Sequence, residues 1–485
     1  MRLNILFFCV LVFGLNVQAQ QEIRIDNLHP RTDINGDTID LHDGRVIKFG
    51  DRFYWYGTSY RNTTGFVRTN HYRCYSSPDM MSWEKEGVLL EDQPSGIYYR
   101  PHVIYNERSG KYVLWYNWYP KLWEGKFGVA VSDSPSGPFA IVNQDVEVAH
   151  TNLGVGDFGL FVDDDQTAYI IYNTIQGHQN SVERLNDDYL TSSMKNGGFI
   201  AAGCEAGAIF KRDSLYYLLT DYTCCFCTQG SGARVYVSDN PMSGYERRNN
   251  INRYPGTPAT ELIDGIRAPN LYASLTKNDD NVFSPAQIDF PKSRRFERVD
   301  IYFFTGNRSG MCGDTLAQQV HAQIVTPEFD LLVKNGLEWE KMNTEVLVER
   351  TSVFNKISYR FETVNSSSVL LKPLSSFPYK SIFINEIKVF NEHEMISSSD
   401  KGTQAFINDM NPGNTLPIVP AQQTYVMPLK TTNGIQFIWM GDLWGSASDN
   451  IKGHDYQYWG APLEFDAEGN ILPMKWTDSW TAIIN

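Results

Sequence analysis

An internal repeat constrains the fold of this 485-residue chain more than any other feature. Five segments start with a polar residue and continue as an apolar strand, with an apolar side chain four positions after the polar one. Because side chains alternate along a strand, these two residues share a face. The five segments begin at Asp43, Arg100, Asp157, Glu205 and Gln422.

Each segment is followed by a turn and a second strand rich in aromatic residues, such as residues 53–56 in the first unit. The turns carry Gly, Asp, Asn or Ser, which favour reverse turns. Three units then reach a similar outer strand, and helical periodicity is nearly absent. Antiparallel units that repeat every ~45–60 residues are typical of a β-propeller. We therefore expect an all-β chain with a propeller of five blades.

The repeat is interrupted between the fourth and the fifth unit. Short apolar runs occupy this interval, for example residues 298–304, 359–364 and 381–390. They predict a separate β-sandwich inserted before the last blade, and the polar stretch behind it predicts a return linker. The expected order is blades 1–4, insert, linker and blade 5, at residues 20–259, 260–395, 396–420 and 421–485.

The N-terminus has the pattern of an export signal. Arg2 precedes the apolar residues 5–15, and Val17-Gln18-Ala19 matches a small-residue cleavage site. The apolar run is shorter than the about 20 residues that span a bilayer. We expect a signal peptide at residues 1–19, no membrane span, and a secreted or periplasmic monomer.

Composition narrows the partners of the chain. The net charge of −14 argues against nucleic acid, which is bound by basic surfaces. The 27 Tyr, 27 Phe and 11 Trp suit strands and also suit the stacking of sugar rings. Export permits disulfides, so Cys224-Cys225-Phe226-Cys227 favours a disulfide or a buried thiol over zinc, for which a second cysteine pair is missing.

The polar residues at the strand starts carry the chemistry. Innermost strands of a propeller line its axis, so these residues converge on one funnel. Neighbouring carboxylates raise one another's pKa and an Arg stabilises their ionised forms, which separates an acid from a base. Glycoside hydrolysis needs such a carboxyl pair. The chain contains no HExxH, GxSxG or phosphate-loop motif that would indicate a rival chemistry.

Three segments resemble blade motifs of glycoside hydrolase family 43: HDGRVI (42–47), GDFGLFVDDD (156–165) and EAGAIFK (205–211). The resemblance covers about residues 38–255 and 415–484. Family members are five-bladed propellers that invert configuration. The resemblance implies that Asp43 is the base, that Asp157 tunes the pKa of the acid, and that Glu205 is the acid.

Other segments are similar to the exo-β-1,3-galactanase-like branch of that family, namely RPHVIY (100–105) and AQQTYVMPL (421–429). In that branch a fifth-blade Gln, matched by Gln422, is thought to replace the base. This chain holds both candidates, and Asp43 is favoured because a carboxylate is the stronger base. Tyr99 stands where the branch has Glu, so galactan specificity stays open. INEIKVF (384–390) resembles galactose-binding-like, discoidin-type sandwiches.

The resemblance predicts a secreted, inverting exo-glycoside hydrolase that removes terminal sugars, galactosyl-type first, from a polysaccharide or oligosaccharide. An α-L-arabinofuranosidase or β-xylosidase on the same fold and a non-catalytic carbohydrate-binding propeller stay open as alternatives. The expected substrate contacts are His42, Tyr99, Arg100 and Trp118. No cofactor and no catalytic metal are expected. A structural calcium ion at residues 163–165 is left open, although a solvated turn is favoured there.

Overall fold

The computed structural model describes residues 20–68, 70–90, 92–268, 271–304, 326–351, 354–408 and 415–484. The predicted signal peptide at residues 1–19 lies outside these ranges. Within them, no helix has both the length and the apolar character needed to cross a membrane.

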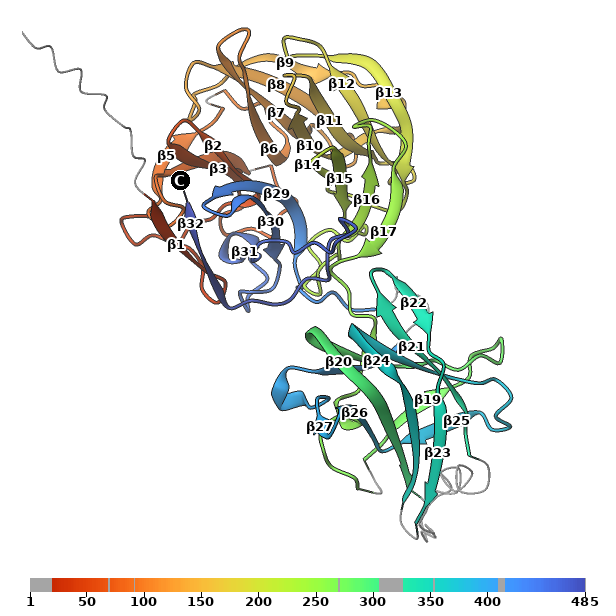
Figure 1. Cartoon of the computed structure of the whole chain (residues 1–485). Coiled ribbons are helices and arrows are strands. Elements are labelled where there is room, and N and C mark those ends of the chain that lie inside the picture. Colours follow the sequence, from red (N-terminus) through yellow and green to blue (C-terminus); the bar gives the residue numbers. More distant parts are fainter. Residues whose placement is uncertain are drawn as a thin grey trace, which may run out of the picture.

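Four sheets of four antiparallel strands form the first four blades, and the strands of each follow one another in the chain. The inner strands β2, β6, β10, β14 and β29 contact one another in a closed ring (Figure 1). The predicted five-bladed propeller is thereby confirmed. Blades 1 and 2 comprise β2 (His42–Phe49), β3 (Arg52–Ser59), β4 (His71–Ser77), β5 (Glu84–Val88), β6 (Ile97–Asn106), β7 (Lys111–Tyr119), β8 (Lys126–Ser132) and β9 (Ala140–Val146). Blades 3 and 4 comprise β10 (Val155–Val162), β11 (Ala168–Thr174), β12 (Asn180–Leu185), β13 (Ser192–Ala201), β14 (Ala208–Arg212), β15 (Leu215–Thr220), β16 (Arg234–Ser238) and β17 (Glu246–Asn250).

The fifth blade joins both ends of the described chain. Its strands from the axis outward are β29 (Gln422–Thr431), β30 (Gly434–Leu443) and β31 (Tyr456–Trp459). The terminal strand β32 (Ser479–Ile484) meets β29 and pairs along its length with β1 (Gln21–Asp26). The prediction assigned residues 20–259 to blades 1–4, so it missed that β1 belongs to the fifth sheet. Pairing of the two ends closes the ring.

Aromatic and aliphatic side chains fill the spaces between neighbouring blades. Between blades 1 and 5, Trp55, Trp83 and Trp459 meet edge to face with ring centroids 5.0–5.9 Å apart. All three are fully buried. Each buried Trp removes roughly 200 Å² from water, worth several kcal/mol at about 25 cal/mol per Å². This packing makes the ring rigid and fixes the inner strands around the axis.

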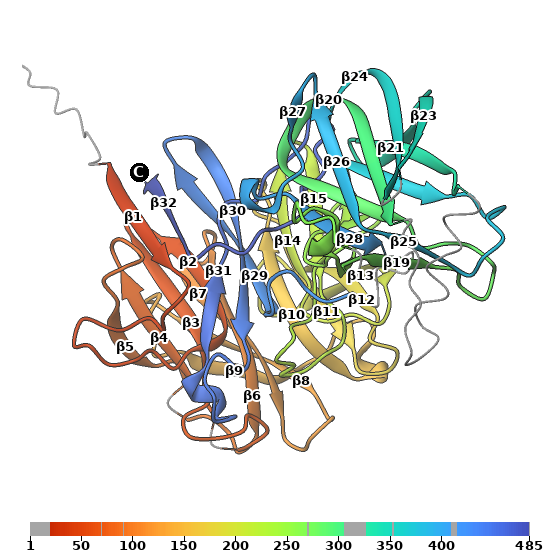
Figure 2. The ribbon, with the colours of Figure 1, turned by 90° about the horizontal axis from the view of Figure 1, so that it is seen from below.

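The interval between blades 4 and 5 folds as a β-sandwich with its own apolar core. Figures 1 and 2 show it beside the propeller, next to blade 4 and away from the axis. Two long strands run through its main sheet, β20 (Ala286–Phe304) and β24 (Phe354–Pro373). The other strands are β18 (Gly256–Pro258), β19 (Ala273–Thr276), β21 (Phe329–Asn335), β22 (Glu338–Lys341), β23 (Glu345–Arg350), β25 (Ser381–Ile384), β26 (Glu386–Asn391), β27 (Glu394–Met395) and β28 (Gln404–Asn408).

The bounds of the insert differ from the predicted 260–395. Strand β28 falls in the predicted linker 396–420, yet it pairs with β20 and with β18. Its apolar residues show why: Ala405 belongs to the sandwich core, Ile407 packs against that core, and Phe406 is buried. Asn252 holds the departing and returning chain together, because its amide exchanges hydrogen bonds with Val419 N (2.7 Å) and Val419 O (3.1 Å).

Candidate active site

Four of the five inner strands carry a β-bulge where they reach the funnel. The register shifts lie between His42 and Arg45, Tyr99 and His102, Val155 and Phe158, and Gln423 and Tyr425. A bulge re-aims the side chain at its position and is common beside active sites. Two of the bulged residues, Asp43 and Arg100, adopt positive φ angles of 55° and 50°. Left-handed backbone is costly for such residues and persists where the surrounding structure holds it.

One pocket at the funnel collects a predicted residue from every blade. Six of the eight predicted site residues line it: Asp43, Tyr99, Arg100, Asp157, Glu205 and Gln422. Aromatic side chains outside those eight residues complete the wall: Tyr60, Phe66, Tyr119, Trp123 and Phe226.

Asp43 is a buried carboxyl group held by two neighbours. Its side chain accepts a hydrogen bond from the hydroxyl of Tyr60, and its backbone N–H donates to Asp442 Oδ2 at 2.8 Å. Burial raises the pKa of Asp43, Arg100 lowers it, and Asp442 raises it again. Burial and the Asp43 charge raise the pKa of Tyr60 well above its usual value, so Tyr60 remains a donor.

Arg100 is the charged centre of the pocket. Its Nε lies 2.8 Å from Asp157 Oδ2, and both terminal nitrogens donate to Gln423 O at 3.3 Å. Burial pulls the pKa of Arg100 down, but Asp157 and Asp43 together raise it above its ordinary value. Burial raises the pKa of Asp157 to about 6 against the opposing effect of Arg100. The guanidinium therefore keeps acidic groups ionisable in a buried site.

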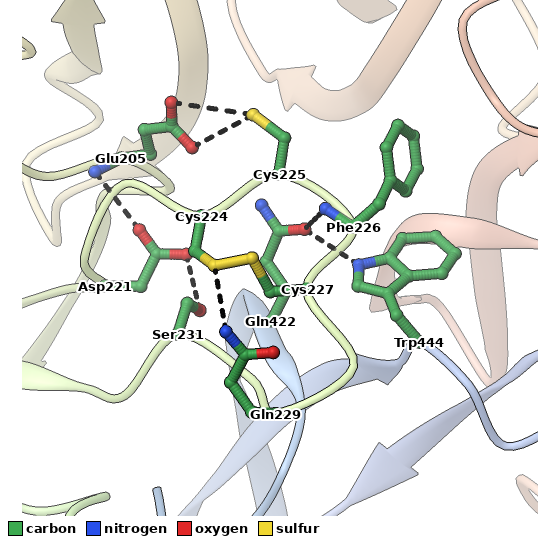
Figure 3. Close-up of a disulfide and its surroundings, with 10 residues drawn as sticks. All are labelled: Glu205, Asp221, Cys224, Cys225, Phe226, Cys227, Gln229, Ser231, Gln422 and Trp444. Carbon is green, nitrogen blue, oxygen red and sulfur yellow. Dashed lines mark hydrogen bonds between the residues drawn. A yellow bond between two sulfur atoms is a disulfide. The ribbon is translucent and has the colours of Figure 1, made fainter. Parts of the chain in front are cut away.

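Glu205 has partners of its own in the same pocket. Its carboxylate lies 3.3 Å from His178 Nδ1 and 3.7 Å from the thiol sulfur of Cys225. Its backbone N–H donates to Asp221 Oδ1 at 3.1 Å, as Figure 3 shows. The hydrogen bond with Glu205 raises the pKa of His178. Glu205 and Asp43 thus occupy different environments in one pocket, as acid-plus-base chemistry requires.

Gln422 lies in the neighbouring fifth blade, at the start of β29. Its Oε1 accepts hydrogen bonds from the indole N–H of Trp444 (2.8 Å) and from the backbone N–H of Phe226 (3.2 Å) (Figure 3). Phe226 belongs to a loop closed by a disulfide between Cys224 and Cys227. The cysteine cluster therefore forms a disulfide with one thiol, Cys225, left between its partners.

His42 does not reach the pocket, so its prediction as a substrate contact is wrong. Its side chain is fully buried between Asp40 (3.4 Å) and Asp442 (3.5 Å). Burial lowers the pKa of His42, but hydrogen bonds with both carboxylates raise it to about 10. His42 thus supports Asp442, which in turn holds the backbone of Asp43.

Trp118 is also wrongly predicted as a substrate contact. Its ring stacks on Tyr98 in the interior of blade 2 and its indole N–H donates to Gln144 O at 2.7 Å. Side chains alternate along β7, so the next residue, Tyr119, faces the pocket instead.

A simple rule of geometry would have found several of the missed residues. The second strand of each blade runs back antiparallel to the first, so its end returns to the same rim. The residues at or directly after these ends line the pocket or contact its residues: Tyr60, Tyr119, Ile175, Asp221 and Trp444. His178, Cys225 and Phe226 lie in loops that cross the funnel, and strand periodicity carries no signal for them.

A metal ion at the axis does not fit the residues beneath the pocket. The guanidinium of Arg45 bridges three inner strands there and donates to the carbonyls of Pro101 (3.0 Å) and Phe158. A cation would meet this positive charge and carbonyl oxygens that are already engaged. Across the described ranges, no group of three or more His, Cys, Asp or Glu side chains is suited to hold a metal.

The turn at residues 163–165 does not fit calcium either. The ammonium group of Lys211 lies 2.8 Å from both Asp163 and Asp164, and the hydroxyl of Tyr216 donates to Asp163 at 2.6 Å. Donors from the protein therefore already engage the carboxylates of Asp163 and Asp164.

Comparison with known proteins agrees with this geometry. Residues 38–261, which span blades 1–4, match the family model described as glycosyl hydrolases family 43. No curated protein sequence matches the chain. The propeller, the family match and the convergent carboxyl groups together support a glycoside hydrolase.

Solved structures share the fold at low sequence identity. An exo-β-1,3-galactanase from Clostridium thermocellum is 17% identical, with a TM-score of 0.54 over 94% of this chain and 66% of its own. A family 43 β-1,3-galactosidase crystallised with galactodeoxynojirimycin is 18% identical, with a TM-score of 0.53 over 94% of this chain and 99% of its own. A second family 43 β-1,3-galactosidase is 18% identical, with a TM-score of 0.52 over 95% of this chain and 64% of its own. The chain thus spans about two thirds of two of these three proteins.

Proposed function

We propose that the chain is an inverting exo-glycoside hydrolase that releases single terminal sugars, galactosyl units first, from a polysaccharide or oligosaccharide. The observation that carries this proposal is the convergence of Asp43, Asp157 and Glu205 around Arg100 in one pocket. A buried cluster of carboxyl groups is costly unless it is used, and glycoside hydrolysis uses one acid and one base.

The reaction assigns a proton to each carboxyl group. Glu205 gives its proton to the departing glycosidic oxygen as the bond to the anomeric carbon breaks. A water molecule attacks that carbon from the opposite face, and Asp43 takes the proton that the water loses. Arg100 keeps Asp157 and Asp43 ionisable, and His178 and Cys225 orient the carboxyl group of Glu205.

An exo mode of attack follows from the shape of the site. Side chains from all five blades close the pocket around the axis, and the aromatic residues Phe66 and Trp123 stand exposed at its rim. A closed pocket holds one sugar at a chain end, whereas an open cleft would admit the middle of a polysaccharide. The exposed rings suit the next sugar unit, whose face stacks on aromatic side chains.

Galactose is the sugar favoured by the structural relatives, two of which are named as β-1,3-galactosidases and one as an exo-β-1,3-galactanase. The galactose-binding interpretation of the sandwich stays a prediction, as do the monomeric state and export. Binding of β-1,3-galactan by the Glu205→Gln protein, measured with and without excess galactose to fill the pocket, tests the sandwich.

One assay tests the proposed function. The protein without residues 1–19 is incubated with aryl β-galactoside, α-L-arabinofuranoside, β-xyloside and β-1,3-galactan, beside a Glu205→Gln control. We expect galactose release that falls 10²–10⁴-fold in the control, and an inverted anomer by NMR. Release of arabinose or xylose would change the sugar but keep the enzyme class. Binding of galactan without turnover of any substrate would refute catalysis in favour of a binding propeller.

A further inference from the structure

The amide of Gln422 has one defined orientation. Its two partners on one side, the indole N–H of Trp444 and the backbone N–H of Phe226, can only donate hydrogen bonds. The amide oxygen must therefore face them, and the NH₂ group points away from both (Figure 3). Gln422 is a lining residue of the pocket, so two N–H donors are what it presents to a sugar.

This orientation conflicts with a role for Gln422 as the base. An amide accepts a proton from water through its nitrogen only as the imidic tautomer, which carries a hydrogen on the oxygen. In this pocket that hydrogen would face the N–H groups of Trp444 and Phe226. Two donors aimed at Oε1 therefore stabilise the ordinary amide. Asp43 has no such restriction, since its carboxylate can take a proton directly.

The orientation depends on the disulfide loop. Phe226 sits between Cys224 and Cys227 with a left-handed backbone of φ 56°. Its ring packs against Trp444 (4.8 Å between centroids) and Tyr60 (5.7 Å). The disulfide closes a very short loop, which restricts the positions open to the Phe226 N–H. The same loop brings the Cys225 thiol to Glu205.

We infer that Gln422 is a fixed hydrogen-bond donor that recognises one hydroxyl oxygen of the terminal sugar, and that the Cys224–Cys227 loop holds it in this role while Asp43 alone serves as the base. The inference rests on the proposed function, whose assay of the wild-type protein comes first. A site built to bond a hydroxyl discriminates strongly against a substrate that lacks it.

Chemical rescue separates the base from the donor. Asp43→Asn should lose 10²–10⁴-fold in kcat, and azide should restore turnover as glycosyl azide, because azide attacks the anomeric carbon without a base while Glu205 still protonates the departing oxygen. Gln422→Met should lose about 10–100-fold in kcat/KM, as expected for one lost hydrogen bond to a buried group, and azide should not restore it. The inference would be overturned if azide restored the turnover of Gln422→Met while Asp43→Asn stayed active without azide.

Deoxygenated substrates identify the hydroxyl. We expect one member of the 2-, 3-, 4- and 6-deoxy aryl β-galactoside series to lose about 10–100-fold more with the wild type than with Gln422→Met, because the variant no longer makes that bond. Equal penalties in both proteins for every member would refute the donor role. A wild type inactive on every parent substrate would instead refute the proposed function, so the two failures are distinct.

The part assigned to the Cys224–Cys227 loop is tested with the same deoxy substrates. A Cys224→Ser, Cys227→Ser protein should show a smaller penalty for that one deoxy substrate, because the Phe226 N–H is no longer held against Gln422. Combining it with Gln422→Met should add no further penalty for that substrate. A full wild-type penalty in the loop variant would show that Trp444 alone orients the amide and would refute the part assigned to the disulfide.

Discussion

The propeller and the sandwich both bury carboxyl groups, but they surround them differently. In the propeller, burial raises the pKa of Asp157 to about 6 while Arg100, 2.8 Å away, stabilises its ionised form. In the sandwich, burial raises the pKa of Glu386 to about 7, and the nearest opposing charge, Lys388, contributes less than burial does. The first group lies in a pocket with Asp43 and Glu205, and the second lies at the start of an interior strand.

This difference shows what an ion pair adds to burial. When a carboxyl group is buried without a partner, its ionisation lowers the stability of the folded state. A guanidinium held by the surrounding chain opposes that loss of stability: Arg100 lowers the pKa of Asp157 and so stabilises an ionised carboxylate inside the site, where catalysis can use it. The predictions below test this contrast, beginning with the largest effect.

Removal of the guanidinium should have the largest consequence. Arg100→Met leaves Asp157 and Asp43 buried without their cation, so we expect about 3–5 kcal/mol less unfolding free energy and loss of turnover. Denaturant unfolding and the galactoside assay measure both. The matched control is Arg108→Met. Arg108 forms an exposed ion pair with Asp187 (2.9 Å), and its loss should lower the unfolding free energy by at most about 1 kcal/mol. Equal losses in both variants would break the comparison.

The pH dependence of activity should reflect the coupled acidic groups. Burial raises the pKa of Asp43 and raises the pKa of Asp157 to about 6, so the acidic limb of kcat/KM should lie at higher pH than the pKa of a free Asp. In Asp157→Asn the Arg100 charge acts on Asp43 alone. We therefore expect the acidic limb to move to lower pH, with about 10–100-fold lower kcat/KM at the optimum. An unchanged limb would contradict this coupling.

The sandwich should lose stability as pH rises. The folded pKa of Glu386, about 7, lies above its ordinary value of 4.5, so between these values the folded state binds more protons than the unfolded state. Stability is then highest near pH 4.5 and falls until about pH 7. Glu386→Gln should flatten this slope in calorimetry, by about 2–4 °C in Tm for each kcal/mol removed. The exposed Glu345→Gln should keep the wild-type slope.

The smallest effect is expected at Trp118. Trp118→Phe removes the hydrogen bond to Gln144 O and should cost about 1 kcal/mol of stability, with kcat/KM unchanged. Its neighbour Tyr119, which lines the pocket, is the contrasting site: Tyr119→Ala should lower kcat/KM. Loss of activity in Trp118→Phe at constant stability would show that the blade interior also contributes to the site.

Much of the fold was predictable because it depends on local pattern. The alternation of apolar side chains and the turn residues predicted five units of strands, and the propeller bears this out. The polar residues at the strand starts were predictable for the same reason, since a ring of blades brings equivalent positions to one axis. Asp43, Arg100, Asp157, Glu205 and Gln422 accordingly meet in one pocket.

Other features depend on contacts between segments far apart in the chain. The pairing of β1 with β32, the place of β28 in the sandwich and the burial of His42 between Asp40 and Asp442 leave no periodic trace in the sequence. The loop that carries Phe226 and Cys225 across the funnel is the same kind of case. A short motif records which residues are near one another along the chain, whereas these contacts are selected by the packing of whole blades.

The sequence by itself therefore determined the blade architecture, the five converging residues and the kind of chemistry that they allow. The tertiary structure decided which way each side chain faces: Tyr119 into the pocket and Trp118 into the buried packing of the blade, Gln422 as a donor, and Arg100 on Asp157. The physical reason is that strand periodicity fixes only a two-fold choice of face. Bulges, left-handed residues and a disulfide loop then re-aim individual side chains, and contacts between blades and loops decide where they point.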